Sequence, residues 1–256
     1  MTRFRSSLLP ALLFLCCCAT AIADQNDPDE TEVRGATVGR AGDPVAVDPE
    51  HFDFSEAENR LWMDDHLANI QKPARLYYSF VKKGSYEDGF TDAVYLDILH
   101  VNDDGSKDTN MQFFTGDREQ PFGADNVTHV RGNPVIGTYM RGDVFEMNRL
   151  TSGSWRYFQR AIKLAFADGA EVQPVKIKFD GKDVDGEKIT ITPFVKDPHR
   201  KQFEKFADKR YEFIVSNDVP GMLYQINTII PTTDPGKDSE PLIQETLTLE
   251  RVEATK

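Results

Sequence analysis

The chain has 256 residues and a formal net charge of −12 at pH 7. An acidic surface repels nucleic-acid phosphates and anionic lipid headgroups, so this balance argues against nucleic-acid binding and against spontaneous docking on a membrane. The length is sufficient for one substantial hydrophobic core that needs no disulfide.

The first 23 residues have the pattern of a signal peptide. Two arginines precede an apolar stretch over residues 8–19, and Ala21-Ile22-Ala23 forms an A-x-A cleavage motif. The stretch is shorter than the roughly 20 apolar residues that span a bilayer. All three cysteines lie at positions 16–18. We therefore predict export to a periplasm-like compartment, cleavage after Ala23, and a mature chain with neither a cysteine nor a transmembrane segment.

Residues 24–50 are rich in Asp, Glu, Gly and Pro and nearly free of large apolar side chains. Such a segment buries too little apolar surface to offset the entropy of ordering, which predicts a disordered acidic arm. No second linker or internal repeat follows, so residues 51–256 are predicted to form a single domain.

The domain begins with a predicted helix, and strands follow it. Ser55-Glu56-Ala57-Glu58 matches a capping box, and Lys72-Pro73 marks the expected end of this helix. Apolar and polar residues then alternate over 76–81 and 94–99, and after a turn at Asp103-Asp104-Gly105 a returning strand is predicted over 110–115. Alternation of this kind is typical of antiparallel strands that have one solvated face.

Two helices are predicted in the middle of the chain. Asn133-Pro134 places a capping residue before a proline at the first helical position. The first helix contains Gly137 and Gly142, each of which costs ~1 kcal/mol relative to alanine. The first helix is predicted to end in Thr151-Ser152-Gly153-Ser154, and Ser154 is expected to cap the second helix. The apolar stripe of that second helix consists of Trp155, Phe158, Ile162, Ala165 and Phe166.

Strand patterns resume after the helices. A hairpin is predicted from 175–179 and 189–193, with its turn within 180–186, and a short helix opens at Asp197-Pro198. Helices grouped between two runs of strands indicate an α+β fold. We predict a curved, mostly antiparallel sheet of about eight strands, a half-barrel, with the central helix pair packed on one face; further closure toward a barrel is the alternative. The last three strands are expected over 211–215, 222–230 and 243–249.

The sequence offers no recognisable catalytic, metal or cofactor motif. The histidines lack zinc-ligand spacings, and Asp64-Asp65-His66 is expected on a solvated helix face. The aspartates in the predicted turns do not complete a calcium loop. Neither a nucleophile elbow nor a phosphate-binding glycine loop is present. We therefore predict no metal site, no cofactor and no catalytic residue.

The second central helix offers the candidate ligand-binding residues. Trp155, Phe158 and Ile162 are predicted to form the apolar wall of a cavity. Arg156 or Arg160 would then meet an anionic head group at its mouth. Ordinary core packing with a salt-bridged outer face explains the same residues without a ligand.

Two stretches, ENRLWMDDHL at 58–67 and LTSGSWRYF at 150–158, resemble those of an uncharacterised family of exported proteobacterial proteins. That resemblance covers most of residues 51–252 and implies no activity. The predicted layout is also similar to that of LolA-type lipoprotein and lipid carriers. This likeness of architecture implies a half-open sheet with a helical lid over an apolar cavity.

Together these features predict an exported, soluble, non-enzymatic envelope protein that binds or carries an apolar or amphipathic ligand such as a lipid. Two alternatives remain open. The acidic arm could fold on an envelope protein partner, which would make the chain an interaction or assembly module. The chain could also be a hydrolase without a recognisable motif, which a polar cleft holding a perturbed acid or histidine would favour.

Overall fold

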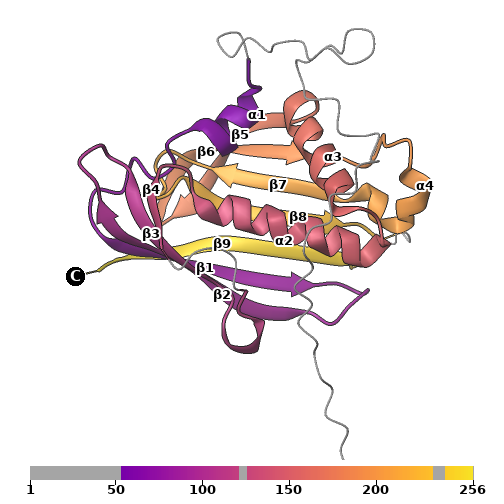
Figure 1. Cartoon of the computed structure of the whole chain (residues 1–256), viewed down its shortest axis with the longest axis horizontal. Helices are drawn as coiled ribbons and strands as arrows, with labels where there is room; N and C mark the ends of the chain where they lie inside the picture. Colours follow the sequence, from indigo (N-terminus) through magenta and orange to yellow (C-terminus); the bar gives the residue numbers. More distant parts are fainter. Residues whose placement is uncertain (1–52, 121–125, 233–239, 256) are drawn as a thin grey trace, which may run out of the picture. The chain divides into compact units, whose positions relative to one another are not determined.

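Nine strands form one antiparallel sheet in the computed structural model, which describes residues 53–120, 126–232 and 240–255. The order across the sheet is β4-β3-β2-β1-β9-β8-β7-β6-β5 (Figure 1). The predicted signal peptide and acidic arm lie outside the described residues. The strands are β1 Ala74–Lys83, β2 Phe90–Val101, β3 Lys107–Phe113, β4 Val127–Val130, β5 Glu171–Phe179, β6 Lys182–Ile191, β7 Arg210–Val215, β8 Leu223–Ile230 and β9 Ile243–Ala254.

Two long helices lie on the same face of this sheet. They are α2, Pro134–Thr151, and α3, Trp155–Asp168 (Figure 1). Among the residues described, no helix is both long and apolar enough to cross a membrane. The short helical segments are α1 Glu56–Glu58 with its π-helical continuation η2 Asn59–Met63, η3 Gly116–Arg118, α4 Arg200–Phe203 and η4 Glu204–Asp208.

The last strand joins the two halves of the sheet. β1 to β4 precede the helix pair and β5 to β8 follow it, while β9 pairs with both β1 and β8. The strands before and after residues 133–168 therefore belong to a single curved sheet. The predicted α+β class, the open antiparallel sheet and the helix pair on one face are confirmed. The pattern missed only β4, because its four residues have no alternation between buried and exposed side chains.

The two long helices pack on different parts of the sheet. In α3, Phe166 packs on Phe213 of β7 with ring centroids 5.5 Å apart, and Phe158 is fully buried. In α2, Tyr139 reaches Thr228 of β8 instead. Side chains of α3 therefore pack on β7, and side chains of α2 reach β8, β9, β1 and the start of β7.

The first helix differs from its prediction. Its capping box at Ser55 and Glu58 is present, but the helical turns end at Met63 rather than at residue 72. The predicted solvated position of His66 is wrong, since the side chain is 1% exposed. Its Nδ1 accepts a hydrogen bond from the backbone N–H of Asn133, and its Nε2 lies 2.8 Å from the carbonyl oxygen of Arg60. Burial lowers the pKa of His66, which favours the neutral ring that these two contacts require.

Two local predictions after the helix break are also corrected. Ser154 occupies the N-cap position of α3, but its hydroxyl makes no capping hydrogen bond. The hairpin of β5 and β6 turns at Asp180-Gly181 alone, where both residues have positive φ, 49° and 72°. An Asp-Gly pair with two positive φ angles suits the tight type I′ turn, so β6 starts at residue 182. Val175 consequently pairs with Gly186.

Candidate functional site

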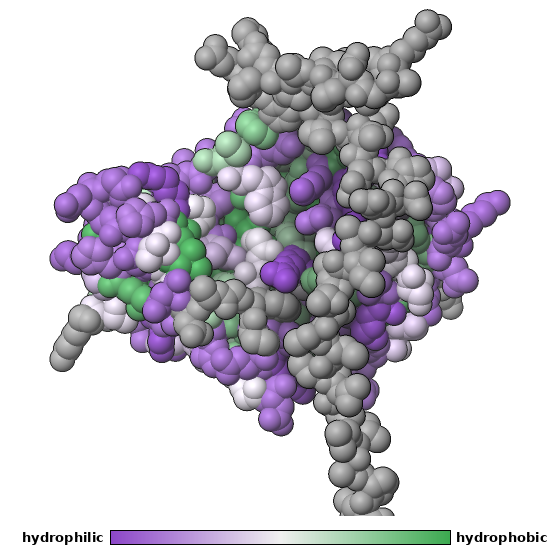
Figure 2. All heavy atoms as spheres, in the orientation of Figure 1, coloured by the Kyte–Doolittle hydropathy of each residue, from purple (hydrophilic) through white to green (hydrophobic). Residues whose placement is uncertain are grey.

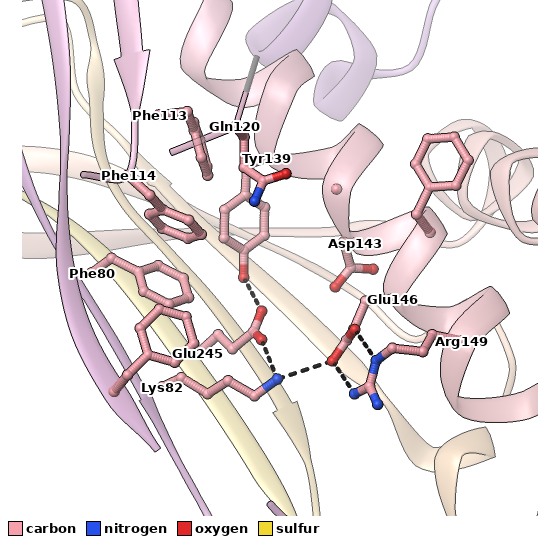
Figure 3. A pocket seen from close by; sticks show the side chains of 13 residues that line it. Phe80, Lys82, Phe113, Phe114, Gln120, Tyr139, Asp143, Glu146, Arg149 and Glu245 are labelled. Carbon is pink, nitrogen blue, oxygen red and sulfur yellow. Dashed lines mark hydrogen bonds and ion pairs between the residues drawn. The ribbon is translucent and has the colours of Figure 1, made fainter. Parts of the chain in front are cut away.

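A cavity of about 370 Å³ lies between α2 and the face of the sheet that α2 covers (Figure 3). It is partly open to solvent, and Figure 2 shows hydrophobic residues exposed on this face among hydrophilic ones. The residues that line the cavity are Phe80 and Lys82 of β1, Phe90 of β2, Phe113 of β3, Phe114 and Gln120, Tyr139, Gly142, Asp143, Phe145, Glu146 and Arg149 of α2, and Glu245 of β9.

Four phenylalanines form the wall of the cavity on the sheet side. The ring of Phe114 lies 4.7 Å from that of Phe80 and 5.7 Å from that of Phe90. Phe113 and Phe114 are consecutive, and in a regular strand they would point to opposite faces. Phe114 has a φ of 68°, which ends the extended strand and allows both rings to lie on the cavity side. Positive φ is rare for a bulky residue, so this wall is built at a cost in backbone energy.

A row of polar side chains crosses the sheet next to this wall. Lys82 pairs with Glu245, Glu245 with Thr228, and Thr228 with Tyr211. Directly paired residues of antiparallel strands point to the same face. The register of β1, β9, β8 and β7 therefore places all four side chains under α2.

The face of α2 above this row is polar as well. Tyr139, Asp143 and Glu146 follow one another at spacings of four and three residues, which puts them on one side of the helix. The Tyr139 hydroxyl lies 3.1 Å from Thr228 Oγ1 and 3.3 Å from Glu245 Oε2. Burial and the neighbouring carboxylates of Glu245 and Asp143 raise the pKa of Tyr139, so its hydroxyl stays protonated.

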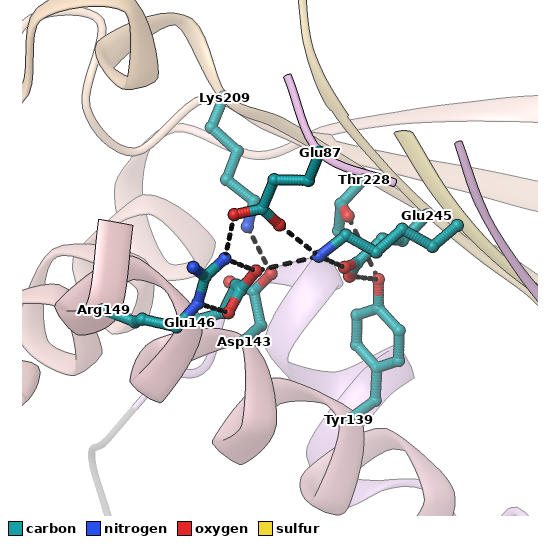
Figure 4. A network of polar contacts seen from close by, with 9 residues as sticks. Glu87, Tyr139, Asp143, Glu146, Arg149, Lys209, Thr228 and Glu245 are labelled. Carbon is teal, nitrogen blue, oxygen red and sulfur yellow. Dashed lines mark hydrogen bonds and ion pairs between the residues drawn. The ribbon is translucent and has the colours of Figure 1, made fainter. Parts of the chain in front are cut away.

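Lys82, labelled in Figure 3, is the centre of an ion-pair network at the polar end of the cavity, and its partners are labelled in Figure 4. Its Nζ lies 2.9 Å from Glu146, 3.1 Å from Glu87 and 3.3 Å from Glu245. Arg149 pairs with Glu146 at 2.7 Å and also with Glu87. Burial alone would raise the pKa of Glu146, but hydrogen bonds from Arg149 and Lys82 outweigh it and lower the pKa to about 2.

A second ion pair is buried beside the network. Asp143 and Lys209 have side chains that are 1% and 3% exposed, and their charged atoms are in direct contact. The Tyr211 hydroxyl donates a hydrogen bond to Asp143 Oδ2 at 2.7 Å. Burial and the adjacent Asp143 carboxylate raise the pKa of Tyr211. Both oxygens of Asp143 are thus satisfied, one by Lys209 and one by Tyr211.

Glu245 is held less tightly than the other carboxylates of the network. Its contacts with Lys82 and Tyr139 are both 3.3 Å long, although its side chain is only 13% exposed. Burial raises the pKa of Glu245, and the positive charges of Lys209 and Lys82 offset this only in part. A buried carboxylate with long contacts has capacity for a further hydrogen bond or positive charge.

The ligand-binding residues predicted from the second central helix, α3, do not line this cavity. Phe158 and Ile162 are 0% and 4% exposed, and Phe158 packs on Phe203 and Phe194 in the core between α3 and the sheet. Trp155 stacks near Phe145, with the guanidinium of Arg156 4.7 Å above its ring. Trp155, Phe158, Ile162, Arg156 and Arg160 are all absent from the described lining of the cavity.

Sequence reasoning missed the residues of α2. A signal was present, because Tyr139, Asp143 and Glu146 repeat with the same helical spacing as the neighbouring apolar stripe. Polar residues are usual along the edge of the apolar face of a helix. Spacing alone therefore does not identify Tyr139, Asp143 and Glu146 as site residues. Within the described ranges, no group of three His, Cys, Asp or Glu side chains could hold a metal ion.

No protein family model and no curated protein matches the chain. Three solved structures with a similar layout are the lipoprotein LppX of Mycobacterium tuberculosis, a LolA superfamily protein from Nitrosomonas europaea and LprF from Mycobacterium bovis. LppX is 11% identical, with 71% of this chain and 87% of LppX covered and a TM-score of 0.30. The LolA superfamily protein is 9% identical, with coverages of 78% and 94% and a TM-score of 0.24. LprF is 14% identical, with coverages of 79% and 96% and a TM-score of 0.29. A LolA superfamily protein, the type to which the predicted layout was similar, is therefore among these solved structures.

Proposed function

We propose that the protein is an exported binder or carrier that takes up an apolar or amphipathic molecule in the cavity between α2 and the sheet. The observation that carries this proposal is the wall of Phe80, Phe90, Phe113 and Phe114, which remains accessible from a cavity of about 370 Å³. This volume lies within the range of small-molecule sites, ~300–1,000 Å³, and such sites are mostly apolar with a few placed polar groups. Export is part of the proposal because of the signal-peptide pattern in residues 1–23.

The polar end supports a binding role because it is already ordered. Lys82, Glu146 and Arg149 satisfy one another without a ligand, so the cavity is preformed and binding need not order these side chains. The affinity should then come from apolar contact with the phenylalanine wall. Each methylene buried there contributes about 0.8 kcal/mol, or roughly a fourfold gain in affinity.

Two glycines of α2 allow a matched test of the cavity. A Cβ at Gly142 or at Gly137 would meet no atom within 4 Å beyond its chain neighbours and the backbone of its own helix. Of the two, Gly142 lines the cavity and Gly137 is exposed. Gly142→Leu should therefore place an isobutyl group in the space for the ligand. We expect decanol to bind at least tenfold more weakly to Gly142→Leu than to the unchanged protein, as measured by calorimetric titration.

Gly137→Leu provides the control for that experiment. Both substitutions replace a helix-interior glycine with a better helix former, so each should leave stability equal or raise it by about 0.5–1 kcal/mol. Gly137→Leu should bind decanol as the unchanged protein does. The proposal fails if the unchanged protein binds neither decanol nor a charged amphipath with the same ten-carbon chain, or if Gly142→Leu binds decanol with undiminished affinity.

A further inference from the structure

The polar end of the cavity carries more negative than positive charge. Among the described residues there, the carboxylates of Glu87, Asp143, Glu146 and Glu245 face the cations of Lys82, Arg149 and Lys209. Each cation is already engaged: Lys82 by three glutamates, Arg149 by two, and Lys209 by Asp143. A ligand anion would have to break one of these pairs in a poorly solvated site, and it would add a fifth negative charge.

Glu245 is the carboxylate of this cluster that a ligand can reach and to which it can add a shorter contact. It lines the cavity, and both of its contacts are 3.3 Å long. It shares the ammonium of Lys82 with Glu87 and Glu146, which lie closer to that ammonium. An added cation would relieve the repulsion between Glu245 and the nearby carboxylates of Asp143 and Glu146, the same repulsion that helps to raise the pKa of Glu245.

The phenylalanine wall favours the same charge. The faces of aromatic rings attract cations that lie within about 6 Å of the ring centroid. The wall already holds one such contact, because the Arg118 guanidinium lies 4.7 Å from the centroid of Phe90. A ligand cation inside the cavity would meet ring faces and the Glu245 carboxylate together.

We propose that the cavity selects cationic amphipaths, in which an ammonium group is joined to an apolar body, and that Glu245 is the counter-ion for that group. This inference rests on the proposed binding function and specifies its ligand class. The proposed ligand charge is the opposite of the anionic head group expected from Arg156 or Arg160 of α3, because those arginines do not line the cavity.

Three ligands with the same ten-carbon chain test the proposal: decyltrimethylammonium, decanol and decanoate. Each is titrated calorimetrically into the full-length protein at pH 7.5, below the concentration at which it forms micelles. We expect decyltrimethylammonium to bind at least tenfold more tightly than decanol, and decanoate to bind most weakly. The preference for the ammonium should decrease at high salt, because a charged pair is screened.

Variants of two glutamates on β9 locate the effect. In Glu245→Gln the ratio of ammonium to decanol affinity should fall toward one, and only the part contributed by the aromatic ring faces should remain. In the control Glu250→Gln, which changes an exposed residue of the same strand, the ratio should be unchanged. If decanoate or decanol binds as tightly as the ammonium, or if Glu245→Gln keeps the ratio, the selectivity inference is overturned while the binding function stands. If none of the three binds, the proposed function itself has failed.

Discussion

Replacement of Asp143 with alanine should lower the free energy of unfolding by about 3–5 kcal/mol, because it leaves a buried charge without its partner. The ammonium of Lys209 is 3% exposed and has Asp143 as its ion-pair partner, and the Tyr211 hydroxyl would lose its acceptor as well. Urea unfolding followed by circular dichroism measures this loss, with the slope against denaturant checked for constancy.

A double variant separates the lost pair from a general disturbance of the core. Asp143→Asn keeps an acceptor for Tyr211, and Lys209→Met removes the buried charge while keeping an unbranched side chain. Combined, they should cost less than about 1.5 kcal/mol, because replacing both members of a buried pair is often nearly neutral. Asp183→Ala, which breaks an exposed pair with Lys178, should cost less than about 1 kcal/mol. Equal losses in the Asp143→Ala single and the double variant would refute this account of the pair.

Glu146→Gln should destabilise the protein by up to about 3 kcal/mol at pH 7, and this difference should disappear in acid. The pKa of Glu146 is about 2 in the folded protein, against an ordinary value of 4.5. A carboxylate with a lowered folded pKa stabilises the fold above its unfolded pKa, and this contribution is lost as the pH falls through the folded value. The contribution is therefore complete above about pH 5 and mostly lost near pH 2.

The measurement is the free energy of unfolding of both proteins between pH 2.5 and pH 7.5. The difference between wild type and Glu146→Gln should be largest at neutral pH and shrink steadily toward pH 2.5. Glu250→Gln is the control, because its exposed carboxylate should give a small difference at every pH. A difference for Glu146→Gln that does not depend on pH would show that the ion pairs with Lys82 and Arg149 do not set the charge of Glu146.

The sequence predicted the hairpin of β5 and β6 and the buried face of the strands other than β4, but not the strands between which β9 lies. Alternation alone identifies the core face of residues 76–81 and 243–249. The pairing of Lys82 with Glu245 depends on β9 inserting between β1 and β8, at the end of a chain whose strands otherwise pair with a neighbour in sequence. The polar row is created by this long-range register, and no local pattern contains it.

The candidate site was harder to predict than the fold for a related reason. The strongest aromatic stripe, on α3, meets a well-matched surface at Phe194 and Phe203 and packs there. Helix propensity alone predicts that α2, which contains two glycines, is less stable than α3. In the structure Gly142 leaves space beside the sheet, so the residue that weakens the helix helps to open the cavity. Intrinsic propensity describes the stability of a helix and says little about the space next to it.

The most direct test of the account is the position of a bound chain relative to the phenylalanine wall. Nuclear Overhauser effects between decanol methylenes and aromatic protons can be recorded on labelled protein and assigned with Phe80→Leu and Phe114→Leu. The account predicts contacts from the methylenes to the rings of Phe80, Phe90 and Phe114, and their loss in Gly142→Leu. Saturable binding with contacts to α3 or the outer surface, and none to these rings, would contradict it.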